Sequence, residues 1–242
     1  MLVTGLGYAM WCWQPQLPAF AKRRRVISLD NRGTGRSPKP PGPYSIAGMA
    51  DDVVAVMDRF GIESAPVLGH SMGGYVAQEL ALRHPSRVRS LVLVGTAAGG
   101  PDSVPVPKET LDIWLANAEL PPREYVRATM WLSFAHGWTD EHPAEYEAFI
   151  ESRLEHPTPP EAWRAQFDAA SRWIDSARPI EEIRVPALVV HGDADRVVPV
   201  DNGREIARRM PDAVLRELPG RGHVLNLEEP AEFNEIVLDF VG

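Results

Sequence analysis

Cysteine is almost absent from this 242-residue sequence, because Cys12 is the only one. One cysteine cannot form an internal disulfide, so the composition suits a reducing compartment. Long hydrophobic runs are missing as well: no stretch approaches the roughly 18 consecutive apolar residues that a membrane span requires. The start of the chain shows no signal-peptide pattern. We therefore expect a cytoplasmic protein that spans no membrane.

An excess of positive charge is also lacking. The 25 lysines and arginines face 33 aspartates and glutamates, which gives a formal net charge of −8. This balance argues against nucleic acid or an anionic membrane as the main partner. Internal repeats and low-complexity segments are absent. With 44% hydrophobic residues, the chain is long enough for one large domain, or for one domain that carries an insert.

The most informative stretch that is present runs from Val67 to Gly74. A short apolar run meets the turn Gly-His-Ser-Met-Gly-Gly, and a helix-like segment follows up to Arg83. A serine at such a strand-turn-helix junction has strained backbone geometry, and its hydroxyl projects above the strand end. The neighbouring glycines let the helix pass close to the strand. The stretch predicts Ser71 as a nucleophile, with a glycine-rich structural turn as the alternative.

Strand and helix patterns alternate along much of the chain. The apolar runs are continuous rather than alternating, which is typical of parallel strands covered on both faces, so we expect an α/β fold. Besides a short strand at residues 2–3, strands are expected at residues 25–30, 65–68, 90–95, 185–190 and 213–218. Helices are expected at residues 17–24, 45–60, 75–83, 202–210 and 230–241.

This alternation stops between residues 100 and 180. No comparable strand run occurs there, only helical patterns separated by prolines. Five of the seven tryptophans fall in this stretch: Trp114, Trp131, Trp138, Trp163 and Trp173. We interpret residues 100–180 as a helical cap inserted into a core made of residues 1–99 and 181–242.

A serine nucleophile needs a base, and in an open parallel sheet that base lies at the carboxyl ends of the strands. Of the seven histidines, His223 fits best, because it lies in a glycine-flanked loop after the last strand. His70 adjoins the serine, so we expect its side chain to point away from this edge. His191 precedes the loop expected to supply the acid, and the other four lie in helical or inserted regions. The alternative for His223 is a loop histidine held by a hydrogen bond.

Two aspartates compete for the role of the acid that orients the base. Asp195 is favoured because the residues after it lead the chain directly to its next helix, whereas Asp193 is expected to shape the turn. The order Ser71, Asp195, His223 matches that of one hydrolase fold. Two backbone N–H groups should stabilise the developing oxyanion, those of Met72 and Leu6. For the loop around Leu6, an ordinary tight turn is the alternative.

These motifs resemble the α/β-hydrolase superfamily over nearly the whole chain, and within it the 3-oxoadipate enol-lactonase-like esterases and lactonases. The resemblance rests on Ser71-Met72-Gly73-Gly74, Asp30 to Ser37, Gly42 to Ile46, His191 to Pro199, and Gly222-His223 with Leu227 to Pro230. It implies a mostly parallel sheet with a helical cap, a Ser-Asp-His triad, and hydrolysis of a carboxylic ester or lactone. It implies no metal and no organic cofactor.

The chain departs from the family in two places. Thr4 stands before Gly5 where relatives usually carry histidine, which bears on the packing of the oxyanion loop. Relatives also have two strands before this loop, whereas this chain starts almost on it. We therefore expect about six strands instead of eight, with a sheet edge left exposed.

Substrate residues are expected in the cap. Trp131, Phe134 and Trp138 are the candidates for an apolar substrate pocket, with the cap's own core as the alternative. Five arginines are candidates for binding a substrate carboxylate, with solvated helix faces as the alternative: Arg123, Arg127, Arg153, Arg164 and Arg172.

Other functions remain open at this stage. The same triad can hydrolyse C–C bonds or act as a cofactor-free haloperoxidase or perhydrolase. A serine at the turn argues against dehalogenase or epoxide hydrolase action, since those relatives use an aspartate nucleophile. A small-molecule receptor on the same fold and an inactive relative are the non-enzyme alternatives. The partner is expected to be a small ester or lactone, and the oligomeric state, a homodimer included, stays open.

Overall fold

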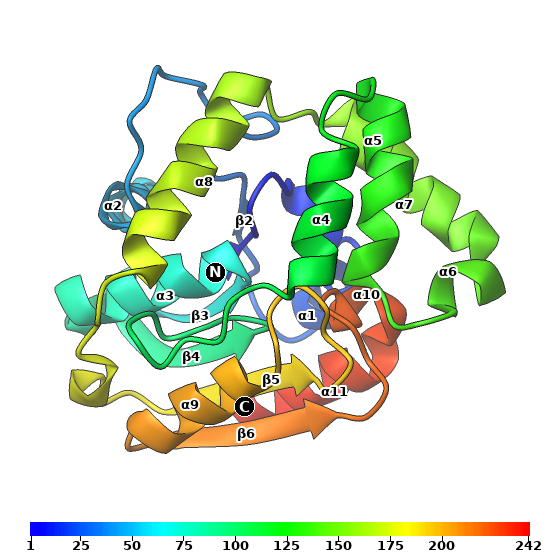
Figure 1. Cartoon of the computed structure of the whole chain (residues 1–242). Coiled ribbons are helices and arrows are strands. Elements are labelled where there is room, and N and C mark those ends of the chain that lie inside the picture. The colour runs from blue at the N-terminus through cyan, green and yellow to red at the C-terminus, as the bar shows by residue number, and fades with distance from the viewer.

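A computed structural model describes every residue from Met1 to Gly242 and contains one sheet of six parallel strands. The strands are β1 (Leu2–Val3), β2 (Ser28–Leu29), β3 (Ala65–His70), β4 (Val88–Val94), β5 (Ala187–Gly192) and β6 (Ala213–Leu218). Their order across the sheet is β2-β1-β3-β4-β5-β6. The predicted α/β class and the expected number of strands are confirmed, and Figure 1 shows how the helices surround the sheet.

Eleven α-helices connect and cover the strands. They are α1 (Leu17–Ala21), α2 (Ile46–Arg59), α3 (Met72–Arg83), α4 (Lys108–Ala116), α5 (Pro122–Thr129), α6 (Trp138–Glu141), α7 (Pro143–Glu155), α8 (Pro160–Ile174), α9 (Asp201–Arg209), α10 (Leu225–Glu228) and α11 (Pro230–Val241). Helix α2 begins as predicted, because the Ser45 hydroxyl accepts the Gly48 N–H at 3.0 Å. Gly61, with a φ of 65°, follows its end.

The core lies on both faces of the sheet. Alternate strand residues point to opposite faces. Val67, Leu91 and Val189 pack with side chains from α2, α3 and α9, whereas Leu68 and Val190 pack with side chains from α1 and α11. Each buried aliphatic side chain contributes about 1.5–3 kcal/mol. The continuous apolar runs of the sequence therefore reflect burial on both sides.

One predicted strand is much shorter than expected. Residues 25–30 read as a β-branched run, but only Ser28 and Leu29 form a strand. β2 lies at the edge of the sheet and pairs only with β1, which offers it two residues, Leu2 and Val3. A pattern in the sequence cannot reveal how many partner residues the neighbouring strand supplies.

The strand register aligns all carboxyl ends at one edge of the sheet. Val3 pairs with Gly69, Gly69 with Leu93, and Leu93 with Val189. The segment between β4 and β5 contributes helices α4 to α8, which gather on one side of the sheet, in the upper half of Figure 1. We call it the α4–α8 segment. The exact boundaries of a cap at residues 100–180 stay a prediction.

Candidate active site

The turn after β3 holds Ser71 in a backbone conformation that few side chains adopt. With φ 54° and ψ −122°, Ser71 is the only non-glycine residue with positive φ. A Cβ at Gly69 would collide with the Gly73 carbonyl, and a Cβ at Gly73 would collide with the Val3 carbonyl. Helix α3 can start this close to the sheet only because both residues are glycines. Strain of this kind costs about 1–3 kcal/mol and concentrates at functional sites.

Asp195 and His223 form a buried pair beyond the carboxyl ends of β5 and β6. The His223 Nδ1 lies 2.8 Å from Asp195 Oδ2, while Oδ1 accepts the N–H groups of Val197 and Val198, both at 2.8 Å. Burial by itself would raise the pKa of Asp195, but the charge of His223 and the hydrogen bonds from His191 and His223 lower it overall. An ionised carboxylate on Nδ1 leaves Nε2 free to accept a proton.

The second aspartate of this loop has a different partner. Asp193 Oδ1 accepts the Gly220 N–H at 2.6 Å and so ties the loop after β5 to the loop after β6. The sequence predicts a turn-shaping role for Asp193, and the contact with Gly220 agrees with it. Only Asp195 of the two contacts His223.

Ser71 and His223 line the same cavity, which has a volume of about 110 Å³. Ser71 is half-buried and His223 is buried. No hydrogen bond joins the two side chains in the free protein, and catalytic hydrogen bonds often tighten only when substrate binds. The other lining residues are Gly5, Leu6, Tyr8, His70, Trp114, Tyr125, Thr129, Met130, Ser133, Arg153, Trp163, Phe167 and Val197.

The two N–H groups expected to bind an oxyanion lie beside Ser71. Met72 is the first residue of α3, so its N–H has no intrahelical acceptor and lies at the positive end of the helix dipole. Leu6 lines the cavity, and its N–H donates to no acceptor.

Gln166 supports the loop that contains Leu6 by accepting the Gly7 N–H at 3.0 Å. Thr4, in the place of the usual histidine, is buried, and its carbonyl accepts the Asn31 side-chain amide at 2.9 Å.

The expectation for His70 is corrected by the structure. Its side chain does not point away from this edge of the sheet but lines the cavity, with its ring centre 4.7 Å from that of His223. Burial, followed by the nearby charge of His223, lowers the pKa of His70 to about 3. The neutral ring can donate from Nε2 to the His223 carbonyl oxygen, 2.9 Å away. The positive φ of Ser71 breaks the strand alternation on which the expectation rested.

Residues 219–224, between β6 and α10, carry His223, and we call them the histidine loop. The buried carboxyl of Glu228, which the sequence did not predict, connects this loop to the α4–α8 segment. Glu228 Oε1 accepts the Ala135 N–H at 2.9 Å and the Gly222 N–H at 3.1 Å. The Val224 N–H also donates to the Ser133 carbonyl at 3.0 Å. Burial raises the pKa of Glu228. The only signal in the sequence was the position of Glu228 in the family-like stretch after His223.

The three aromatic residues expected in the substrate pocket do not line the cavity. Phe134 and Trp138 are buried and stack on each other with ring centres 4.7 Å apart, while the Arg196 guanidinium lies 4.9 Å from the Trp131 ring. Phe134 and Trp138 form part of the internal packing of the α4–α8 segment, which was the alternative, whereas Trp131 is half-buried and packs on Arg196 of the loop after β5. The aromatic lining comes instead from Tyr8, Trp114, Tyr125, Trp163 and Phe167.

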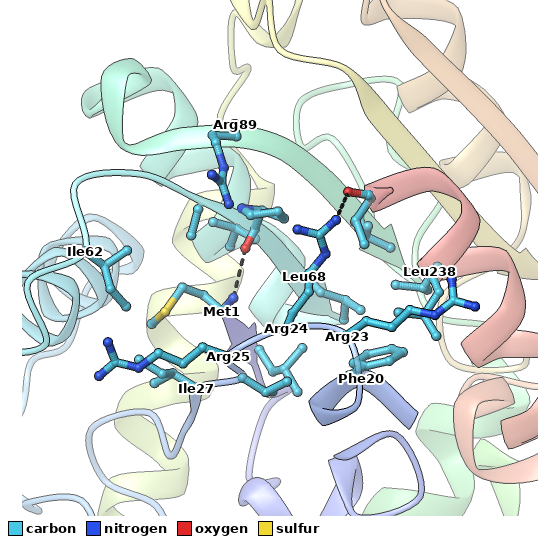
Figure 2. Close-up of a pocket in the computed structure, with 18 of the residues that line it drawn as sticks. Met1, Phe20, Arg23, Arg24, Arg25, Ile27, Ile62, Leu68, Arg89 and Leu238 are labelled. Atoms are coloured by element: carbon cyan, nitrogen blue, oxygen red, sulfur yellow. Dashed lines mark hydrogen bonds between the residues drawn. The ribbon is translucent and has the colours of Figure 1, made fainter. Parts of the chain in front are cut away.

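A larger cavity, of about 280 Å³, lies at the opposite edge of the sheet, where the strands begin (Figure 2). Four arginines surround it: Arg23, Arg24, Arg25 and Arg89. The Met1 amino group donates to the Pro66 carbonyl at 2.9 Å in its wall. Its lining is largely apolar and contains no histidine, cysteine or carboxylate, so it offers no nucleophile-base pair.

Two further features of the structure concern metal ions and membranes. No three histidine, cysteine, aspartate or glutamate side chains lie together in a way that could hold a metal ion. None of the helices is long and apolar enough to cross a membrane.

Comparison with known proteins agrees with this geometry. Residues 1–230 match the family model described as the alpha/beta hydrolase fold. The chain is 35% identical over 243 residues to a Caulobacter sp. (strain K31) protein assigned as the carbamate hydrolase RutD, covering 100% of this chain and 89% of that protein. It is 33% identical to the 2-hydroxymuconate semialdehyde hydrolase of Pseudomonas sp. (strain CF600), covering 98% and 84%.

Solved structures show the same likeness. The enol-lactonase from Burkholderia xenovorans LB400 superposes with a TM-score of 0.82 at 31% identity, covering 99% of this chain and 89% of that one. The names of these three relatives describe hydrolytic enzymes with different substrates.

Proposed function

The chain belongs to the alpha/beta hydrolase fold family, and on that basis we propose that it hydrolyses a carboxylic ester or lactone through an acyl enzyme on Ser71. The observation that carries the proposal is the convergence of three features on one edge of the sheet. Ser71 lies on a strained turn, the buried Asp195–His223 pair is 2.8 Å across, and Ser71 and His223 share one cavity.

The geometry suits acylation of Ser71. His223 Nε2 accepts the hydroxyl proton while Ser71 Oγ attacks the substrate carbonyl, whose π electrons move onto oxygen. The N–H groups of Leu6 and Met72 donate to this oxyanion. The oxyanion then re-forms the carbonyl and expels the leaving alkoxide, which takes the proton from His223 Nε2. Asp195 stays ionised and stabilises the imidazolium.

Deacylation repeats these steps with water. His223 removes a proton from a water molecule, the resulting hydroxide adds to the acyl carbonyl, and the ester bond to Ser71 breaks. Ser71 Oγ recovers the proton from His223, and the carboxylic acid leaves. The low pKa of Asp195 keeps its charge available throughout.

The test is the hydrolysis rate of p-nitrophenyl butyrate with the purified chain and with Ser71→Ala. We expect the variant to lose about 10⁴-fold or more of kcat, as for other serine hydrolases that lose their nucleophile. Ser64→Ala is the matched control, since Ser64 lines the larger cavity and should keep full activity. Equal rates for the chain and Ser71→Ala would remove Ser71 from the mechanism.

A carbamate is the second candidate substrate, because the chain is 35% identical over its whole length to a protein assigned as a carbamate hydrolase. The same attack on a carbonyl carbon and the same oxyanion donors would serve this reaction. A panel containing an ester, a γ-lactone and an alkyl carbamate of matched size distinguishes the two. The highest kcat/KM identifies the class of bond that the site favours.

A further inference from the structure

Five arginines of the α4–α8 segment were candidates for binding an anionic substrate, and the structure separates them. Four already have partners. Arg123 pairs with Glu151, Arg127 with Glu147 at 2.7 Å, and Arg164 with Asp168 at 3.1 Å, while Arg172 donates to the Tyr44 carbonyl at 2.8 Å. None of these four lines the cavity that holds Ser71.

Arg153 differs from them in both respects. It projects from α7, lines the cavity together with Ser71 and His223, and has no carboxylate within 4 Å. Its guanidinium carbon lies 5.0 Å from the centre of the Tyr8 ring, which is itself part of the cavity wall. A cation stacked on an aromatic ring keeps its in-plane N–H groups available to an acceptor.

The charges around the cavity make this arginine unusual. Its lining contains no aspartate or glutamate, and Arg153 is its only lysine or arginine. The whole chain carries a net charge of −8, which disfavours anions in general. An unpaired cation in the cavity that holds Ser71 therefore provides attraction for an anion at the candidate site itself. A half-buried position strengthens the interaction relative to bulk water.

We propose that Arg153 binds a carboxylate carried by the substrate, so that the preferred substrates are esters or lactones with a second, ionised carboxyl group. This inference rests on the proposed hydrolysis at Ser71 and narrows its substrate class.

The experiment compares two substrates that differ by one charge, mono-p-nitrophenyl glutarate and its methyl ester, with the uncatalysed rate subtracted. We expect the unmodified chain to have a kcat/KM for the anionic ester about tenfold or more above that for the neutral one. In Arg153→Met this ratio should fall at least about tenfold, mainly through KM. Arg153→Lys should restore part of the ratio, since it keeps the charge but not the planar fork.

Arg127→Met is the matched control, because it removes an arginine of the same segment that is paired with Glu147 and lies outside the cavity lining. It should keep the ratio of the unmodified chain. Raising the salt concentration should lower the ratio for the unmodified chain and leave that of Arg153→Met unchanged. A structural role of Arg153 on Tyr8 alone would lower both rates equally, and that result overturns the inference.

Binding measurements keep the test independent of turnover. In Ser71→Ala, monomethyl glutarate should bind more tightly than dimethyl glutarate by titration calorimetry, and Arg153→Met should remove the difference. Equal affinities in Ser71→Ala would overturn the proposed role of Arg153. Failure of the unmodified chain to hydrolyse any ester, together with charge-selective binding, would instead overturn the hydrolysis at Ser71 and leave anion recognition by Arg153 standing.

Discussion

The two cavities lie at opposite edges of one sheet, and they differ in what the strands deliver to them. At the carboxyl edge, the loops after β3 and β6 bring Ser71 and His223 to a cavity of about 110 Å³, and the loop after β5 places the buried Asp195 2.8 Å from His223. At the amino edge, about 280 Å³ is surrounded by arginines with no base or acid (Figure 2). The larger cavity therefore has no base or acid that could activate a nucleophile. Convergence of ionisable groups on a strained turn indicates a reactive site more reliably than size does.

The largest change in activity is expected when the two aspartates after β5 are substituted one at a time. In Asp195→Asn we expect kcat for ester hydrolysis to fall about 10⁴-fold, because an amide cannot stabilise the imidazolium or enforce the right tautomer. In Asp193→Asn the amide oxygen can still accept the Gly220 N–H, so kcat should change less than about threefold. Equal losses in the two variants would show that this carboxyl edge contributes only loop structure.

A smaller effect should appear in the pH dependence of stability. His70 in the folded chain has a pKa of about 3 because it is buried, whereas in the unfolded chain it titrates near 6.5. The unfolded state therefore binds an extra proton as the pH falls below about 6.5, and the folded state loses about 2 kcal/mol of stability between pH 7 and pH 5.

Urea unfolding at both pH values measures this loss in the unmodified chain and in His70→Gln. The variant has no titrating ring at this position but retains His223, Asp195 and His191, which face it. Its stability should fall by about 2 kcal/mol less than that of the unmodified chain over this interval. The same pH dependence in both proteins would contradict a buried neutral imidazole in the cavity wall.

The smallest effect is expected at the amino edge. Arg89→Met removes one of the arginines around the larger cavity, near the start of β4 and far from the strand ends that lead to Ser71, Asp195 and His223. Since Arg89 is exposed and has no ion-pair partner, kcat/KM for ester hydrolysis should stay within about twofold of the unmodified chain. A tenfold change in kcat/KM would contradict this expectation, because it would show that the amino edge of the sheet influences the reaction at the carboxyl edge.

The parts of the site that follow strand topology could be predicted from the sequence. Continuous apolar runs locate parallel strands, and parallel strands share a carboxyl edge, so Ser71, Asp195 and His223 could be grouped before the structure was known. The strand at residues 213–218 and the helix at residues 230–241 have the predicted bounds.

The parts that depend on packing between distant segments could not be predicted. Glu228 and Ala135 are 93 residues apart in the sequence, and no motif around either residue predicts their contact. The aromatic residues of the α4–α8 segment all suit an apolar pocket equally, and only the helix orientations decide that Phe134 is internal while Trp163 faces the cavity. Four of the five arginines have partners on other parts of the chain, and Arg153 alone is unpaired and lines the cavity that holds Ser71.

The hydrogen bonds that connect the α4–α8 segment to the loops after β5 and β6 involve main-chain atoms of the segment, at residues 133–135. Glu228 accepts the Ala135 N–H, and the Val224 N–H donates to the Ser133 carbonyl. Arg196, in the loop after β5, adds a third contact by donating to the Phe134 carbonyl at 2.8 Å. Main-chain groups are the same whatever side chains surround them. These contacts therefore do not depend on which side chains residues 133–135 carry, and substitutions elsewhere in the segment can change the surface around the cavity without removing them.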